Sequence, residues 1–200
     1  MILLALESTD ERASLALLTE ANCREVLIQS PLRHEQTLMP AVDALLSEEN
    51  ITPSDLTALA VDVGPGSFTG VRIGVCHANA MAAALGIPVI PVNALEALSY
   101  PHLQQDRPVA AIIDARNGNG YGALYAPDGT QLLPPDAIEI DPFLRQLPQN
   151  AILTGTGAPQ GDGALPAAGA VARLAQGRPG QKEAHPLYLR PSQAERMHKG

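Results

Sequence analysis

The chain has little of what several common functions need. Its 200 residues include two cysteines, four tyrosines, two phenylalanines and no tryptophan. Cys23 and Cys76 are too few for a cysteine-only zinc site, and their spacing fits no redox motif, so we expect both to be reduced packing residues. With so few aromatic side chains, a stacking platform for single-stranded bases is not expected.

Positive charge is also scarce. The sequence has 13 Lys and Arg against 21 Asp and Glu, a net charge of −8, whereas a large non-specific nucleic-acid surface needs clustered cations. We therefore expect any contact with RNA to be indirect. No apolar run reaches the ~18 residues of a membrane span, and the start of the chain has no basic segment or cleavage site. These features predict a cytoplasmic protein with no membrane partner.

The histidines exclude one kind of metal site. They stand at positions 34, 77, 102, 185 and 198, so no two are four residues apart. A helical His-x-x-x-His site is therefore absent, and we predict no bound metal. Neither a Ser-His-Asp arrangement nor a nucleophile motif can be argued from position, which leaves a peptidase poorly supported.

Alternating and helical patterns predict an α/β protein. In the first half, we expect strands at 1–7, 13–19, 23–29, 57–63 and 88–92, and helices at 35–49, 69–85 and 94–99. In the second half, we expect strands at 109–114, 121–126, 130–133 and 151–154, and a helix near 165–175. The composition changes near 100–108, which predicts an N-terminal domain at 1–104 and a smaller C-terminal domain, with a surface tail, at 105–200.

The stretch GPGSFTG at 64–70 is the most informative loop, because it follows a strand and opens a helix. Backbone N–H groups attract anions at such a place, yet the loop lacks the lysine of a Walker motif. Two interpretations stay open: the glycines only permit a tight turn, or they contact a phosphate or a partner. The candidate phosphate-binding residues are Ser8, Thr9, Gly64, Gly66, Ser67 and, at a later strand end, Asp114.

The helix that follows this loop carries small residues at four-residue spacing, namely Gly70, Gly74, Ala78 and Ala82. Such a ridge allows close packing of another element. Either the ridge packs inside this chain against the sheet and the 35–49 helix, or the two helices leave an apolar face for another protein. In the second case Arg72, His77 and Asn79 supply a polar rim.

Long stretches of the first half resemble one family. LLALESTDERASLALL, RHEQTLMPAVDALL, LAVDVGPGSFTGVRIGVCHANAMAAALGIPVIPVNALEAL and the DAR at 114–116 closely resemble the bacterial TsaB (YeaZ) family. The resemblance implies a two-lobed actin-like, RNase H-like (ASKHA) α/β fold, here with a short second lobe. It also implies a role in forming the threonylcarbamoyl group on adenosine of tRNAs that read codons beginning with A.

The resemblance further implies a scaffold and not the catalyst. A TsaD-like catalytic subunit would dock on the two N-terminal helices, a TsaE-like ATPase would join, and a homodimer would form in isolation. No cofactor is firmly implied, although weak ATP or ADP binding at the partner interface fits the family. The interface residues expected on this basis are Arg33, His34, Leu38, Val42, Leu45, Arg72, Val75 and Asn79.

One departure bears on the alternative function. Family members usually carry Asp where this chain has Glu7, and the longer side chain would crowd a phosphate site. The alternative is an enzyme in its own right, a small ATP-dependent transferase or kinase of the same fold. It would use Ser8, Thr9, Asp114 and the 64–70 loop on phosphates.

Overall fold

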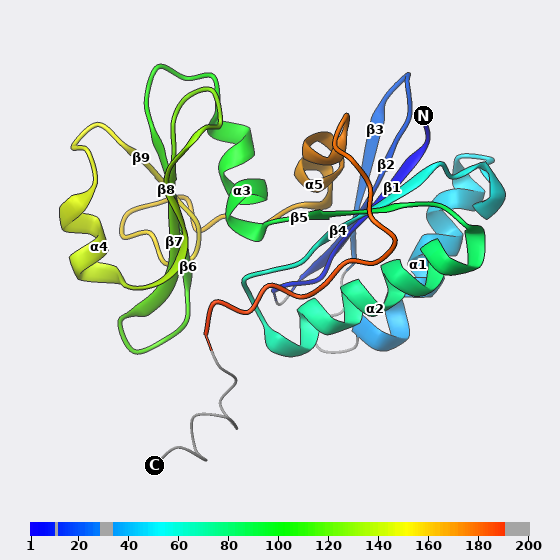
Figure 1. The fold of residues 1–200 in the computed structure, drawn as a ribbon, viewed down its shortest axis with the longest axis horizontal. Helices are drawn as coiled ribbons and strands as arrows, with labels where there is room; N and C mark the ends of the chain where they lie inside the picture. The colour runs from blue at the N-terminus through cyan, green and yellow to red at the C-terminus, as the bar shows by residue number, and fades with distance from the viewer. Residues whose placement is uncertain (11, 29–33, 191–200) are drawn as a thin grey trace, which may run out of the picture. The chain divides into compact units, whose positions relative to one another are not determined.

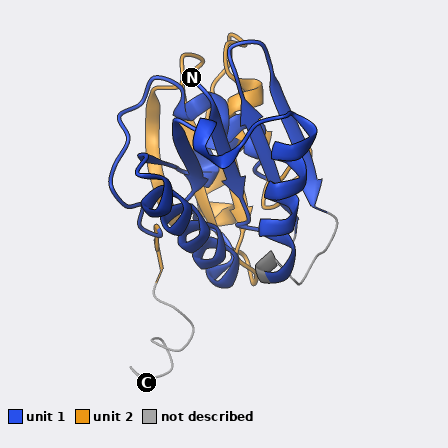
Figure 2. Ribbon diagram, turned by 90° about the vertical axis from the view of Figure 1, so that its right-hand side faces the viewer, with its two compact units in different colours: residues 1–97, 166–186 blue, residues 98–165, 187–200 orange. Residues whose placement is uncertain are grey.

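The described part of the chain forms two units, each with its own β-sheet. The computed structural model describes residues 1–10, 12–28 and 34–190. Unit 1 comprises residues 1–97 and 166–186, and unit 2 comprises residues 98–165 and the described part of 187–200 (Figure 2). This confirms the mixed α/β class predicted from the sequence.

The sheet of unit 1 has five strands in the order β3-β2-β1-β4-β5 (Figure 1). Their bounds are β1 Leu3–Glu7, β2 Ala13–Leu18, β3 Cys23–Ile28, β4 Ala58–Asp62 and β5 Val89–Val92. The first three pair antiparallel through short turns, whereas β1, β4 and β5 run parallel. Strands β1, β2 and β4 are buried at every residue, which explains their almost continuous apolar sequences.

Helices cover both faces of this sheet. Figure 1 shows α1 (His34–Glu48) and α2 (Phe68–Leu85) on one side, and α5 (Ala168–Ala175) on the other. Helix α2 begins at the Ser67 N-cap and ends at Gly86, whose φ of 68° is left-handed. A residue without a Cβ takes this conformation at no steric cost. The short helix α3 (Ala94–Ser99) and the turns η1 (Pro53–Asp55) and η2 (Tyr100–His102) complete this half of the chain.

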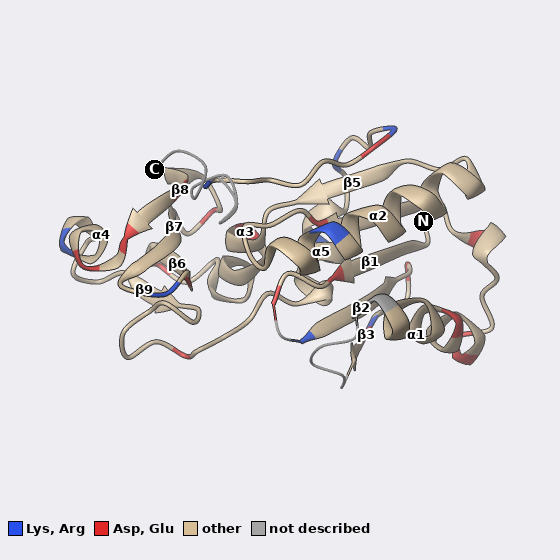
Figure 3. Cartoon of the chain, turned by 90° about the horizontal axis from the view of Figure 1, so that it is seen from below, with Lys and Arg blue, Asp and Glu red and all other residues tan. Residues whose placement is uncertain are grey.

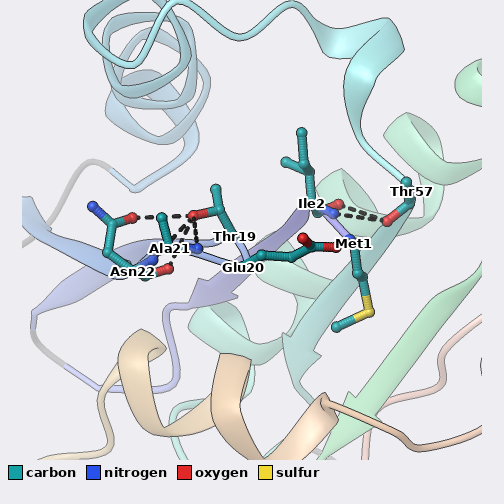
Figure 4. Close-up of polar contacts among 7 residues, drawn as sticks. All are labelled: Met1, Ile2, Thr19, Glu20, Ala21, Asn22 and Thr57. Atoms are coloured by element: carbon teal, nitrogen blue, oxygen red, sulfur yellow. Dashed lines mark hydrogen bonds and ion pairs between the residues drawn. The ribbon is translucent and has the colours of Figure 1, made fainter.

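The amino-terminal end of β1 is fixed by side chains as well as by the sheet. The Thr57 hydroxyl donates to the Ile2 carbonyl at 2.9 Å and accepts from the Ile2 N–H at 3.0 Å (Figure 4). At the β2–β3 turn, the Thr19 N–H donates to the Asn22 carbonyl at 2.8 Å. The Thr57–Ile2 bonds join the starts of β1 and β4, in the register that brings the far ends of these strands side by side.

Unit 2 has a four-stranded sheet in the order β8-β7-β6-β9. Its strands are β6 Val109–Asp114, β7 Asn119–Tyr125, β8 Gln131–Glu139 and β9 Ile152–Thr154, and its helix α4 spans Ile140–Gln146. Strand β8 is longer than the predicted 130–133, and α4 was not predicted. Pro134 and Pro135 interrupt the strand pattern, but an exposed edge strand tolerates proline because it needs fewer ladder donors.

The division into units differs from the predicted boundary between residues 104 and 105. The chain leaves unit 1 after residue 97 and returns to it for 166–186. The cause is α5, whose apolar face is buried on the first sheet. Its first turn is held there by the Ser14 hydroxyl, which accepts the Ala168 N–H at 2.9 Å, and by Glu25, which accepts the Gly169 N–H at 3.0 Å.

Candidate functional site

The 64–70 loop lies directly on the turn that follows β1. The Ser67 N–H donates to the Thr9 carbonyl at 2.6 Å, and the Ser8 hydroxyl donates to the Gly70 carbonyl at 2.9 Å. The structure therefore brings together five of the six candidate phosphate-binding residues, which are Ser8, Thr9, Gly64, Gly66 and Ser67. They meet through contacts within the chain.

Three glycines make this close approach feasible. A Cβ on Gly66 would lie 2.8 Å from Thr9 Cβ, and one on Gly74 would lie 2.5 Å from Ser8 Oγ. A Cβ on Gly70 would overlap the Ser8 carbonyl oxygen. The absence of side chains at these positions thus has a structural cause. It lets the loop and the start of α2 pack on Ser8 and Thr9.

Beneath the loop lie two buried acids. Glu7 ends β1 and is 2% exposed, and Asp62 ends β4 and is 1% exposed. Glu7 Oε1 accepts the Thr9 N–H at 2.6 Å and the Thr9 hydroxyl at 2.8 Å. Asp62 Oδ1 accepts the Gly64 N–H at 2.8 Å, and its Oδ2 lies 3.5 Å from the Thr9 hydroxyl oxygen. Thr9 thus stands between the two carboxyl groups.

Burial dominates the electrostatics of this pair. Loss of water raises the pKa of Glu7 well above its usual value, and the neighbouring Asp62 charge raises it further. Burial also raises the pKa of Asp62 to about 7, against the opposing effect of the Gly64 N–H and the Thr9 hydroxyl. Both carboxyl groups therefore favour the neutral form more than ordinary acids do.

Asp62 was missed as a site residue in the sequence. The signal was present: one acid stands in an otherwise apolar strand, two residues before the glycine-rich 64–70 loop. Because β1 and β4 are parallel neighbours with Leu6 opposite Val61, their carboxyl ends place Glu7 and Asp62 side by side. That adjacency depends on strand order, which local patterns do not reveal.

The sixth candidate, Asp114, belongs to unit 2. It ends β6 and is exposed, and its carboxylate accepts the Arg116 N–H at 2.9 Å. Its own N–H donates to the Thr156 hydroxyl at 3.1 Å.

The predicted apolar interface is wrong for four of its residues. Leu38, Val42, Leu45 and Val75 are at most 3% exposed and belong to the core. The periodic ridges of α1 and α2 face the sheet, as the interpretation with internal packing supposed. They are not an uncovered strip for a partner.

The other interface candidates differ in their surroundings. Asn79 is engaged within the chain, since its amide donates to the Ala184 carbonyl at 2.9 Å and accepts the Ala184 N–H at 2.8 Å. Arg72 is exposed, and its guanidinium stacks 3.9 Å from the centre of the Phe68 ring. Arg33 lies outside the described residues, and so does the side chain of His34.

A different side of α2 faces solvent. We call it the outer face, and it consists of the exposed residues Thr69, Arg72, Cys76, Ala80 and Ala83. Its members recur at spacings of three or four residues, so they lie on one stripe of the helix. Beyond Arg72 the helix has no Asp, Glu, Lys or Arg, and Figure 3 shows its later turns without charge colour. Its one histidine, His77, is half-buried. Cys76, expected to be a packing residue, is exposed here.

No group of three or more His, Cys, Asp or Glu side chains in the described residues could hold a metal ion. No helix formed by them has both the length and the apolar character that crossing a membrane requires.

Known proteins were compared with the whole chain. A family model described as TsaD, tRNA N6-adenosine threonylcarbamoyltransferase, matches residues 29–157. The tRNA threonylcarbamoyladenosine biosynthesis protein TsaB of Bacillus subtilis is 38% identical over 62% of this chain and 55% of its own length. Its Escherichia coli counterpart is 35% identical over 64% and 56%. The chain thus spans about half the length of the curated relatives it matches.

Solved structures give fuller coverage. The structure titled YeaZ from Pseudomonas aeruginosa superposes with a TM-score of 0.80 and 31% identity, over 94% of this chain and 99% of that one. A second Pseudomonas aeruginosa structure, described as having similarity to peptidase YEAZ, gives a TM-score of 0.79 at 28% identity. The fold is therefore that of the YeaZ structures across nearly the whole chain, which fits the actin-like architecture.

Proposed function

The chain belongs to the TsaB (YeaZ) family, and from this we propose that it is an accessory, non-catalytic subunit in the threonylcarbamoylation of adenosine in tRNA. The named relatives in Bacillus subtilis and Escherichia coli are proteins of this biosynthesis. A net charge of −8 and few aromatic residues fit a protein that meets tRNA through a partner rather than directly. A catalytic subunit supplies the transfer chemistry in this proposal.

The outer face of α2 is the docking surface in this proposal. The observation that carries it is the absence of Asp, Glu, Lys and Arg from Ile73 to Leu85, about three and a half helical turns that include the exposed Cys76, Ala80 and Ala83. The centres of protein interfaces are depleted in charged residues. Arg72 lies at one end of the face, where a rim contact is expected. The partner in this proposal is a TsaD-type transferase, a protein whose family model also matches residues 29–157 of this chain, so the two are related in sequence.

The wider assembly in this proposal follows from membership of the TsaB family. A TsaE-type ATPase joins the pair, and the outer face meets a second copy of this chain when the transferase is absent. Weak ATP or ADP binding belongs to the partner interface. Gly66 and Gly70 of the 64–70 loop do not by themselves argue for a phosphate site in the isolated chain, because close contacts with Thr9 and Ser8 already account for them.

Charged substitutions on the outer face test the docking proposal. Ala80→Arg and Ala83→Arg place a long cation at exposed positions, and arginine is a good helix former. We expect each variant to keep the wild-type melting temperature and to lose co-elution with the TsaD-type transferase of the same cell on size-exclusion chromatography. Gln146→Arg on α4 is the matched control, because it adds the same charge to an exposed helix of unit 2.

Two results would contradict the proposal. Unchanged co-elution of both outer-face variants would remove α2 as the docking surface. Calorimetry of the isolated chain with ATP and Mg²⁺ addresses the accessory role itself. Binding tighter than about 10 µM, near −7 kcal/mol, would favour an ATP-dependent enzyme acting alone.

A further inference from the structure

The two buried acids of unit 1 have no cation of their own. Among the described residues, neither Glu7 nor Asp62 forms an ion pair with a basic side chain. An isolated buried carboxylate is costly, and two side by side also repel each other.

The hydrogen bonds around Thr9 indicate how many protons the Glu7 and Asp62 carboxyl groups hold between them. A threonine hydroxyl has one proton to donate and can accept as well. The Thr9 hydroxyl oxygen lies 2.8 Å from Glu7 Oε1 and 3.5 Å from Asp62 Oδ2. If both acids were ionised, this single proton could serve only one of them. If either carboxyl holds one proton, it donates to the Thr9 oxygen while the hydroxyl donates to the other.

We propose that Glu7 and Asp62 hold one proton in common near neutral pH, and that this proton keeps the 64–70 loop closed on the turn after β1. Backbone hydrogen bonds hold the loop next to each of the two carboxyl groups. Asp62 Oδ1 accepts the Gly64 N–H, and Thr9, which bonds Glu7, accepts the Ser67 N–H on its carbonyl. Loss of the proton sets two anions against each other directly beneath these anchors, so the loop and the start of α2 loosen.

The surroundings leave the pair to set the pH response. Across the sheet, Glu7 faces Ser14 on β2 and Asp62 faces Val92 on β5, both uncharged. The described charged or titratable groups on the elements packed against the pair are Asp10 and Arg12 in the turn, Arg72, Cys76 and His77 on α2, and Arg173 on α5. His77 Nδ1 lies 2.8 Å from the Ile73 carbonyl oxygen of its own helix. The three arginines are exposed to solvent, and the Asp10 charge raises the pKa of Glu7.

The sign of the effect follows from linkage. Both pKa values are raised in the folded state, so the folded chain binds more protons than the unfolded chain above the ordinary acid range. The stabilising contribution is fully present below the unfolded pKa near 4. It is lost as the pH rises through the folded value, which is about 7 for Asp62. Each proton released changes the unfolding equilibrium constant up to about tenfold per pH unit.

Urea unfolding of the full chain between pH 5.5 and 8.5 tests this. We expect the wild-type unfolding constant to rise steeply with pH, and the Glu7→Gln/Asp62→Asn double variant to lose most of this dependence. Asp43→Asn, at an exposed position of α1, should keep the wild-type profile and serves as the matched control. A flat wild-type profile, or a double variant that keeps the wild-type slope, would overturn the proposal.

Two measurements on the wild type remain decisive even if the double variant does not fold. Infrared spectroscopy should show a protonated carboxyl band at pH 6 that disappears by about pH 9. Hydrogen exchange in residues 64–70, relative to β6 of unit 2, should accelerate over the same pH range beyond the intrinsic base catalysis. No such band at pH 6, or equal acceleration in both segments, would refute the shared proton and its coupling to the loop.

Discussion

Two glycines of α2 meet different parts of the same serine, and this difference makes a sharp prediction. A Cβ at residue 70 would overlap the backbone carbonyl of Ser8, whereas a Cβ at residue 74 would lie 2.5 Å from the Ser8 hydroxyl oxygen and 3.8 Å from its Cβ. The Ser8 carbonyl belongs to buried backbone directly after β1 and cannot move cheaply, but a hydroxyl can rotate or be removed. Gly70→Ala and Gly74→Ala should therefore respond differently to Ser8→Ala.

The expected magnitudes come from two opposing contributions. Replacing glycine by alanine within a helix stabilises it by up to about 1 kcal/mol. Forcing a methyl group into filled space costs about 1–3 kcal/mol, and more where the neighbour is rigid. We expect Gly70→Ala to lower the free energy of unfolding by about 2 kcal/mol. Gly74→Ala should lower it by about 1 kcal/mol or less.

Urea denaturation of the single and double variants measures these values. In the Ser8→Ala background, Gly74→Ala should become neutral or stabilising, because the clashing oxygen is gone. Gly70→Ala should keep its full cost there, because the Ser8 carbonyl remains. Ala83→Gly on the outer face is the reference for helix propensity alone, with an expected loss of about 1 kcal/mol. A stable Gly70→Ala variant, or its rescue by Ser8→Ala, would refute the packing of the loop on this turn.

Two further predictions concern unit 1. Leu45→Ala should lower the free energy of unfolding by about 2–5 kcal/mol, because Leu45 is 1% exposed. Ala44→Ser, on the exposed side of α1, should change this free energy by less than about 0.5 kcal/mol. Similar losses for the two variants in urea unfolding would contradict the assignment of Leu45 to the core. Asn79→Ala should cost about 1–3 kcal/mol and speed hydrogen exchange at residues 182–186, because both bonds to the Ala184 backbone are lost; unchanged exchange would show that Asn79 does not hold this segment.

Much of the local structure could be predicted from the sequence. The expected 109–114 strand coincides with β6, and the 69–85 helix differs from α2 by one residue at its start. Glycine and proline mark the ends of these elements clearly. Helix α4 was missed because it is seven residues long and contains Pro142, which leaves too few turns for a periodic pattern.

What could not be predicted depends on contacts between distant segments. Nothing in the glycine-rich sequence around α5 shows that it returns to the first sheet, where Ser14 and Glu25 hold its first turn. The pairing of Glu7 with Asp62 likewise requires the order of β1 and β4. The period of α2 identified a small-residue ridge correctly. It could not show which side of the helix was buried, because both sides are apolar.

The two apolar sides of α2 have different physical causes. The residues on the buried side are small because Ser8 and β4 approach this side closely, so its glycines follow from the fold. The outer face meets no such constraint, since Ala80 and Ala83 are exposed. Helix α1 lies on the same side of the sheet and has Asp43, Ser47 and Glu48 at its exposed positions, as a solvated helix does. The fold therefore accounts for the inner side of α2 but not for the missing charges outside, and a partner that covers this face would account for them.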